Sequence, residues 1–204
     1  MPAEARTDEE LVEAYRRGET AAFATLVRRH HDDLIRFLVR LTGNAAVAED
    51  AFQESFLQVH LSAESFDVSR RFKPWLFTIA ANKARDALRR SSRRKALDLS
   101  APIAGSGGED GQGQTYVDLM EIDVDPPHAA LDAEERNRLV QEALAGLPYS
   151  LREILLLAYF QRMSYNQVAE ALGIPLGTVK SRLHSAVAAF ARRWNIVSKG
   201  YMDE

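Results

Sequence analysis

The chain has 204 residues, of which 46% are hydrophobic and 27% are charged, a composition typical of a globular protein with one ordinary domain or two small ones. It contains no cysteine, which excludes disulfides, thiolate chemistry and thiolate zinc sites. No apolar run approaches the ~20 residues that span a bilayer, and the N-terminus lacks the apolar stretch of a signal peptide. We therefore expect a cytoplasmic protein that is not inserted in a membrane.

The formal net charge of −3 conceals two segments of opposite charge. Residues 70–95 contain ten basic side chains and one acidic residue, Asp86. Residues 96–135 contain ten acidic side chains and no basic ones. A basic segment this dense, interleaved with aromatic residues, indicates a polyanionic partner rather than an ordinary solvated helix face.

Apolar residues recur with a helical period along nearly the whole chain, so we expect an all-α fold. Thr7–Glu10 has the sequence of a capping box and predicts a short helix that ends at Gly18. A second helix is predicted over about 20–42. It carries its apolar residues on one face and ends at Gly43.

A third helix is predicted over about 45–62, with Asn44 as its N-cap. Pro74 suits the first turn of a fourth helix, which continues through the basic segment. Because these helices can bury their apolar faces against one another, we expect residues 1–95 to form one compact helical domain.

The composition changes after the basic segment. Residues 96–129 are acidic and rich in glycine and serine, so they cannot bury a core, and we expect a flexible linker there. Residues 130–204 are again helical in pattern and predict a second small domain. Within it, Ser150 and Ser164 each begin a further capping-box sequence.

Residues 164–190 predict a helix-turn-helix. Gly173 suits the tight turn between the two helices, because glycine accepts a positive φ without a Cβ clash. The second helix, from about Pro175, buries Val179 and Leu183 on one face. An ordinary helical hairpin with a solvated face is the alternative. The opposite face presents hydrogen-bonding and cationic groups suited to a DNA major groove: Thr178, Lys180, Ser181, Arg182, His184 and Ser185.

Three segments resemble the extracytoplasmic-function (ECF) sigma factors, the small bacterial subunits that give RNA polymerase its promoter specificity. The segment LGIPLGTVKSRL (172–183) is similar to the family's second conserved region. AEDAFQESF (48–56) resembles its core-polymerase-binding helix, and FKPWLFTIAANKARDALRR (72–90) resembles its promoter-melting helix. The segments follow the family's order, and the resemblance covers about 8–95 and 130–193. It implies sigma region 2 for the first domain and sigma region 4 for the second.

The third helix has side chains suited to docking on a protein. Asp50, Gln53 and Glu54 share one side of it at positions i, i+3 and i+4. The resemblance implies that this side binds the clamp coiled-coil of the largest polymerase subunits, whereas a solvated face on a core helix is the alternative. Phe52 is expected in the domain core. The polymerase-binding residues that we expect are Glu49, Asp50, Gln53, Glu54, Phe56 and Leu57.

Melted DNA requires cations for its phosphates and flat surfaces for its unstacked bases. Residues 66–95 supply both. The resemblance places Asn82 and Asp86 against the −10 element and assigns a flipped base to the loop at about 63–71. Trp75 and Phe77 point to different sides of the helix, so we expect at least one in the core, and a mainly structural role for Trp75. The expected −10 residues are Phe66, Arg70, Arg71, Lys73, Trp75, Asn82, Lys83, Asp86, Arg89 and Arg90.

The resemblance also implies the partners of the second domain and of the linker. The exposed face of the recognition helix would read the −35 element. The partners implied are core RNA polymerase, promoter DNA and an anti-sigma factor. The acidic linker would mimic nucleic acid in the polymerase cleft, unless it is only a solubilising tether. Its residues to test are Asp118, Glu121, Asp123 and Asp125.

No phosphate-binding loop, nucleophile elbow or pair of catalytic carboxylates is recognisable. The run His30-His31-Asp32-Asp33 is unsuited to a metal, because adjacent residues of a helix point about 100° apart. We therefore expect no catalytic activity, no metal, no cofactor and no small-molecule substrate. The alternatives to a sigma factor are a sigma mimic that sequesters an anti-sigma factor and a plain helix-turn-helix regulator.

Overall fold

The computed structural model describes residues 6–98 and 133–202. Every regular element in these two ranges is helical, which confirms the predicted all-α fold class. The predicted linker, 96–129, lies outside the described residues except for 96–98, which belong to the last turn of a helix. The acidic residues expected to mimic nucleic acid are thus outside the described part of the chain.

The first described range forms α1 (Asp8–Arg16), α2 (Thr20–Thr42), α3 (Ala45–Ser62), the 3₁₀ turn η2 (Ala63–Ser65) and α4 (Phe72–Asp98). The capping box predicted at the start of α1 is confirmed. The Glu10 amide donates to Thr7 Oγ1 at 3.2 Å, and the Thr7 amide donates to Glu10 Oε2 at 2.8 Å. Asn44 caps α3, since its Oδ1 accepts the Val47 amide at 3.1 Å. α4 starts two residues before Pro74 and extends three residues beyond the predicted end at 95.

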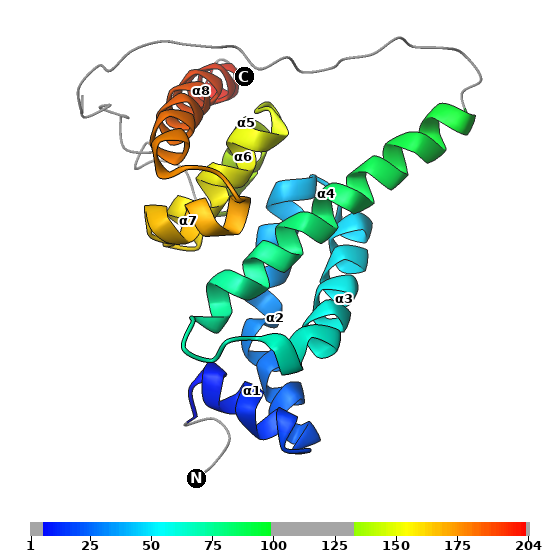
Figure 1. Ribbon diagram of the computed structural model, residues 1–204. Coiled ribbons are helices and arrows are strands. Elements are labelled where there is room, and N and C mark those ends of the chain that lie inside the picture. Colours follow the sequence, from blue (N-terminus) through cyan, green and yellow to red (C-terminus); the bar gives the residue numbers. More distant parts are fainter. Residues whose placement is uncertain (1–5, 99–132, 203–204) are drawn as a thin grey trace.

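In the first half of the fold, α2, α3 and α4 run side by side and α1 lies at one end of them (Figure 1). Gly43, with a φ of 68°, ends α2 in the left-handed conformation that lets the chain reverse into α3. The rings of Phe37 and Phe77 meet edge to face at 5.1 Å in the core. The predicted core position of Phe52 is also confirmed, because its side chain is buried.

α4 packs closely against its neighbours through small side chains. Its inward positions after the first two turns are alanines, so the backbones of adjacent helices can approach without large side chains between them. All four are buried: Ala80, Ala81, Ala84 and Ala87. We call these residues the α4 alanines.

The second described range forms α5 (Ala133–Ala145), α6 (Tyr149–Leu155), the π-helical turn η3 (Leu156–Phe160), α7 (Tyr165–Leu172) and α8 (Leu176–Met202). The capping box at Ser164 is confirmed by reciprocal bonds with Gln167, at 3.3 and 2.8 Å. Gly173, with a φ of 64°, makes the turn between α7 and α8.

The capping box predicted at Ser150 is wrong. α6 begins at Tyr149, so Ser150 already lies inside the helix; the N-cap is Pro148, two residues before Ser150, and no side chain caps the helix. Glu153, the residue expected to reach back to the cap, instead points inward and accepts a hydrogen bond from α4. A partner for a buried carboxylate outweighs one capping bond, because an unpaired buried charge is far more costly.

The two halves of the fold touch. α7 lies against α4, while α5, α6 and η3 lie against α2 (Figure 1). Hydrophobic residues of both halves contribute to one continuous cluster of buried side chains.

Candidate nucleic-acid and polymerase interfaces

The outward side of α3 is acidic at its start and apolar at its end. Glu49, Asp50 and Gln53 are exposed, and Gln53 Nε2 donates to Glu49 Oε1 at 3.5 Å. Leu57 is also exposed, with 57% of its surface open to solvent. Phe56, by contrast, is buried against Phe52 at a ring separation of 5.1 Å, so it supports this surface from beneath.

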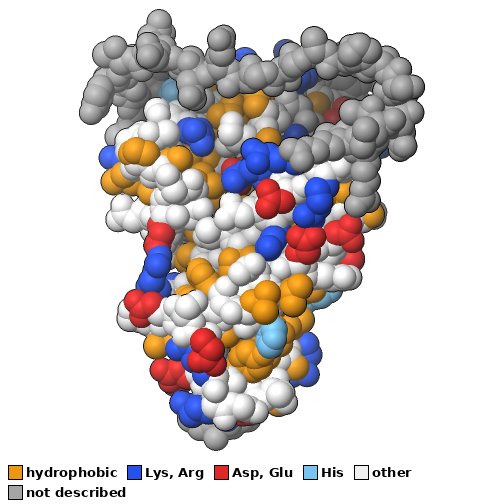
Figure 2. All heavy atoms as spheres, turned by 45° about the vertical axis from the view of Figure 1, so that its right-hand side comes forward, with side chains coloured by type: hydrophobic (Ala, Val, Ile, Leu, Met, Phe, Trp, Pro, Cys, Tyr) orange, Lys and Arg blue, Asp and Glu red, His pale blue; other side chains and the backbone are white. Residues whose placement is uncertain are grey.

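Two contacts join this side of α3 to α4. Arg90 Nη2 donates to Glu54 Oε1 at 2.6 Å, and Lys83 Nζ donates to Gln58 Oε1 at 3.3 Å. Figure 2, which brings the side of α3 and α4 forward, shows basic and acidic side chains interspersed across the middle of this face. Two predicted DNA-binding residues, Arg90 and Lys83, are thus joined directly to the side of α3 that carries the predicted polymerase-binding residues.

The aromatic residues around the start of α4 pack against one another in tilted and edge-to-face arrangements. Phe66 is buried and lies 4.4 Å from the Trp75 ring and 6.0 Å from the Phe72 ring. Phe77 is fully buried on the other side of the helix, as expected for one member of the Trp75–Phe77 pair. Trp75 is half-buried, so one part of its ring packs on Phe66 while another part remains accessible. Phe66, predicted to contact the −10 element, is instead buried and packs against the Trp75 ring.

Side chains of α1 form hydrogen bonds with the backbone of the segment that precedes α4. Arg16 Nε donates to Ala63 O at 2.7 Å, and its Nη2 donates to Phe66 O. Glu9 Oε1 accepts the Phe72 amide at 2.9 Å, which satisfies one of the free amides at the start of α4. These contacts fix the backbone of the loop that was expected to receive a flipped base.

Most of the predicted −10 side chains lie on the surface. Arg71, Asn82, Asp86 and Arg89 are exposed, as is Arg70. Lys73 is half-buried, and its Nζ lies 3.6 Å from Asp33 Oδ2 on α2. The arrangement offers several cations along about five turns of one helix, and such cations bind nucleic acid through its phosphates.

The predicted −35 residues occupy the outward side of α8. Lys180, Ser181, His184 and Ser185 are exposed, whereas Thr178 and Arg182 are half-buried. Ser185 Oγ donates to Ser181 O at 3.1 Å, so the lone pairs of the Ser185 hydroxyl remain available as acceptors. This face has the size and the donors of a helix that enters a major groove.

The comparisons with known proteins agree with this geometry. Residues 26–94 match the model of sigma-70 region 2, and residues 137–190 match the model of sigma-70 region 4. The ECF RNA polymerase sigma factor SigW of Bacillus subtilis is 31% identical over 182 residues, which cover 89% of this chain and 94% of that protein. SigL of Mycobacterium tuberculosis H37Rv is 38% identical over 177 residues, covering 84% and 90%. This chain belongs to the ECF RNA polymerase sigma factors.

Two solved structures show the same fold as this ECF sigma factor. CnrH in complex with the cytosolic domain of CnrY has a TM-score of 0.63 and 22% identity, covering 94% of this chain and 99% of that one. The sigma factor RpoE of Bartonella quintana, in complex with the anti-sigma factor NepR, also has a TM-score of 0.63 and 22% identity, covering 85% and 97%.

The structure of this ECF sigma factor adds a charged contact that sequence reasoning missed. Glu153 is buried, and its Oε1 accepts a hydrogen bond from Arg85 Nη2 at 2.7 Å. Burial raises the pKa of Glu153, although the charges of Arg85 and Arg182 act in the opposite direction. A lone acidic residue before the run Ile154–Leu157 was the available indication, because a charge among buried side chains needs a partner.

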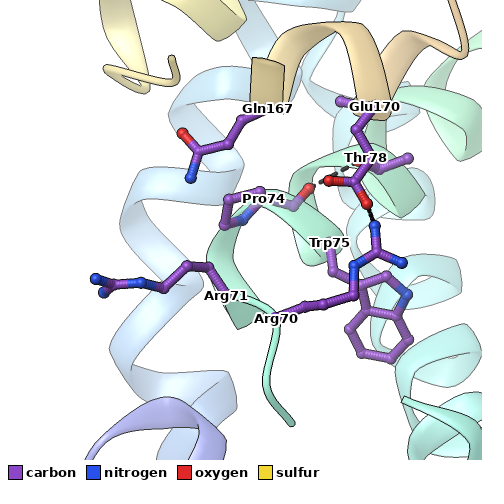
Figure 3. A pocket seen from close by; sticks show the side chains of 8 residues that line it. Arg70, Arg71, Pro74, Trp75, Thr78, Gln167 and Glu170 are labelled. Carbon is purple, nitrogen blue, oxygen red and sulfur yellow. Dashed lines mark hydrogen bonds and ion pairs between the residues drawn. The ribbon is translucent and has the colours of Figure 1, made fainter. Parts of the chain in front are cut away.

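A cavity of about 260 Å³ lies where α7 faces the start of α4. Figure 3 shows that Arg70 turns towards Glu170, with which it forms an ion pair, whereas Arg71 points away from it. Trp75 and Thr78 line the α4 side of this cavity. Two of the predicted −10 residues, Arg70 and Trp75, therefore face α7 of the helix-turn-helix.

No three histidine or acidic side chains among the described residues lie close enough together to hold a metal. His30 and His31 instead bind Asp8 and Asp32, each at 2.8 Å. None of the described helices combines the length and the apolar content that crossing a bilayer requires.

Proposed function

We propose that this ECF sigma factor acts in the cytoplasm, binds core RNA polymerase and directs promoter-specific transcription initiation. The observation that carries the proposal is the arrangement of α3 and α4. An acidic and apolar docking side on α3 lies next to the cationic side of α4 and is tied to it by the Arg90–Glu54 pair. A plain DNA-binding regulator requires no such second surface.

Each helix has a separate task in this function. α3 docks on the polymerase through the outward group Glu49, Asp50, Gln53, Glu54 and Leu57. α4 binds the melted −10 element, with arginines on phosphates and Trp75 against an unstacked base. α8 enters the major groove of the −35 element. The sigma factor performs no covalent step itself, because the polymerase makes the phosphodiester bonds.

We further propose that an anti-sigma factor is among the partners. Bartonella quintana RpoE, whose fold this chain shares, was solved in complex with the anti-sigma factor NepR. Such a partner would cover the apolar residues that α3 exposes, Leu57 and Leu61, or those around α7, Tyr159 and Tyr165.

Run-off transcription sequencing tests the function directly. Genomic DNA of the source organism is transcribed by core polymerase with and without this protein. New transcripts that share a two-part upstream motif would establish a sigma factor and give its promoter sequence. If folded protein and active core produce no new transcripts, the proposal fails in favour of a mimic that sequesters an anti-sigma factor.

A further inference from the structure

One side of α1 reaches both ends of the segment that leads into α4. Arg16 donates to Ala63 O through Nε and to Phe66 O through Nη2, which holds the start of the segment. Glu9 Oε1 accepts the Phe72 amide at 2.9 Å, which holds its end. Because Glu9 and Arg16 are about two turns apart on α1, their side chains project from the same side of that helix.

The side chains at the two ends are anchored as well. Phe66 and Phe72 are buried, and their rings meet edge to face at 6.0 Å. The ring of His30 on α2 lies 5.5 Å from the Phe72 ring, and His30 Nε2 is bound to Asp8 Oδ2 of α1 at 2.8 Å. Only residues 67–71, which we call the 67–71 loop, lie between these anchored ends.

The 67–71 loop also has hydrogen bonds of its own. The Arg70 amide donates to Asp67 O at 3.0 Å, and the Ser69 amide donates to Asp67 Oδ1 at 2.9 Å, as in an Asx turn. Four of its side chains are exposed: Asp67, Ser69, Arg70 and Arg71. The loop therefore presents polar and cationic groups on a backbone that is held at both ends and in the middle.

A loop held in this way can select among bases by shape. A binding site discriminates between similar ligands only when its groups are kept close to one geometry, which requires support from residues outside the site. A loop released at one end would adapt to more than one base and would lose more conformational freedom on binding. Neither Glu9 nor Arg16 is among the residues expected to bind polymerase or DNA, so their contacts with the backbone are left without a role in the proposed function.

We propose that Glu9 and Arg16 are positioning residues that determine the base selectivity of the 67–71 loop. They act through the backbone groups of Ala63, Phe66 and Phe72 to which they are bonded. The helix α1 is thereby part of the machinery that selects a promoter. The inference rests on the proposed function, because the loop receives an unstacked base only in a protein that melts DNA.

Amide hydrogen exchange of the free, full-length protein tests the positioning without reference to transcription. Arg16→Gln removes the guanidinium, so the amides of Phe66, Ser69 and Arg70 should exchange faster, while the amide of the buried Ala80 in α4 should stay protected. Arg17→Gln is the matched control. It makes the same change at the next residue, whose side chain is 71% exposed, and should leave the exchange of the loop unchanged.

Glu9 offers a second, independent variant. Glu9→Ala removes the acceptor of the Phe72 amide, so that amide should exchange faster. Glu9→Gln keeps an oxygen at the same place and should restore the slow exchange, which separates the hydrogen bond from the charge. Glu13→Ala, one turn later on α1, is the matched control.

Base selectivity is measured with holoenzyme, by single-round transcription from a promoter in which each base of the −10 and −35 elements is replaced in turn. Arg16→Gln and Glu9→Ala should each lower the discrimination at one −10 position roughly threefold to tenfold, the effect of one hydrogen bond. Glu9→Gln should retain it. Discrimination within the −35 element and the affinity for core polymerase should be unchanged in every variant, because α8 and α3 are not altered.

The outcomes separate this inference from the proposed function. Unchanged exchange of the loop amides in both Arg16→Gln and Glu9→Ala would refute the positioning. Faster exchange with full discrimination, or an equal loss of transcription from every altered promoter, would refute the role in selectivity. A parent holoenzyme that yields no promoter-specific transcripts would instead contradict the sigma function, and with it the selectivity, while amide exchange would still decide the positioning.

Discussion

Arg90 Nη2 donates to Glu54 Oε1 at 2.6 Å, which ties the helix expected to hold melted DNA to the helix expected to dock on polymerase. Both side chains are about half exposed, so the pair contributes at most about 1 kcal/mol. A polymerase cation that approaches Glu54 would therefore release Arg90 for a DNA phosphate at little cost. We therefore expect the two binding events to share this ion pair.

The first prediction concerns the polymerase-binding side of α3. Asp50→Ala combined with Glu54→Ala should weaken core-polymerase binding about tenfold, because rim and partly buried charges each contribute on the order of 1 kcal/mol to association. Titration of labelled protein with core polymerase measures the affinity. Glu64→Ala, at an exposed position of η2, is the control. Preserved affinity in the double variant would remove this helix from the interface.

The second prediction concerns the recognition helix. Arg182→Ala should reduce initiation from a −35-dependent promoter about tenfold, because a good arginine contact to a base edge discriminates by ~1–3 kcal/mol. Core-polymerase binding should be unchanged. Arg192→Ala, an exposed position later on α8, should retain initiation. An equal loss of core binding in Arg182→Ala would contradict the assigned role.

The third prediction concerns the accessible part of the Trp75 ring. Trp194 is 5% exposed, so Trp194→Phe leaves Trp75 as a single, half-buried fluorophore. Stacking of a base on this ring should quench its emission when a DNA single strand is added. Emission that does not respond, although anisotropy shows that the strand has bound, would make Trp75 purely structural.

The fourth prediction concerns pH and the Asp8 carboxylate, which accepts hydrogen bonds from Arg29 at 2.6 Å and His30 at 2.8 Å. Burial raises the pKa of Asp8, but the hydrogen bonds and charges of His30 and Arg29 outweigh it and hold this pKa below 3.8. The unfolded chain therefore binds this proton more tightly than the folded one. The stabilisation is present above the ordinary pKa and is lost as the pH falls below it.

Asp8→Asn should accordingly lower the free energy of unfolding by about 1.5–3 kcal/mol at neutral pH, the value of hydrogen bonds to charged groups. The difference from the parent should shrink as the pH falls through 3.8. Urea unfolding at a series of pH values measures it. Asp32→Asn, whose side chain is 79% exposed, should change stability by less than about 0.5 kcal/mol. A constant difference down to acid pH would show that Asp8 acts without its charge.

Local patterns in the sequence were sufficient for the helices. The caps at Thr7, Asn44 and Ser164 and the turns at Gly43 and Gly173 lie where the sequence places them, because each depends on residues within one turn of the chain. The cap at Ser150 failed because Glu153 is engaged by Arg85, which is 68 positions away in the sequence. A pattern within a few residues cannot predict a contact between side chains so far apart in the sequence.

For the candidate surfaces, too, local features were predicted and contacts between distant residues were not. Helical spacing placed Lys180 on the surface, and the family resemblance placed Asn82 and Asp86 there; all three are exposed in the structure. Spacing alone did not predict that Phe56 and Phe66 are buried, since both depend on which neighbouring helix covers them. The packing of α6 and α7 against α4 could not be predicted from a local pattern either, because it joins two halves that the linker separates in the sequence.

The α4 alanines occupy the buried side of α4, and the residues expected to bind DNA occupy its exposed side, so the two sides tolerate substitution differently. Any larger side chain at Ala80, Ala81 or Ala84 would push adjacent helices apart, so these positions have almost no freedom to change. Asn82, Asp86 and Arg89 are exposed, so these positions can change with little effect on the stability of the fold. A new promoter preference can therefore arise by single substitutions on one side of a helix whose other side is kept fixed by packing.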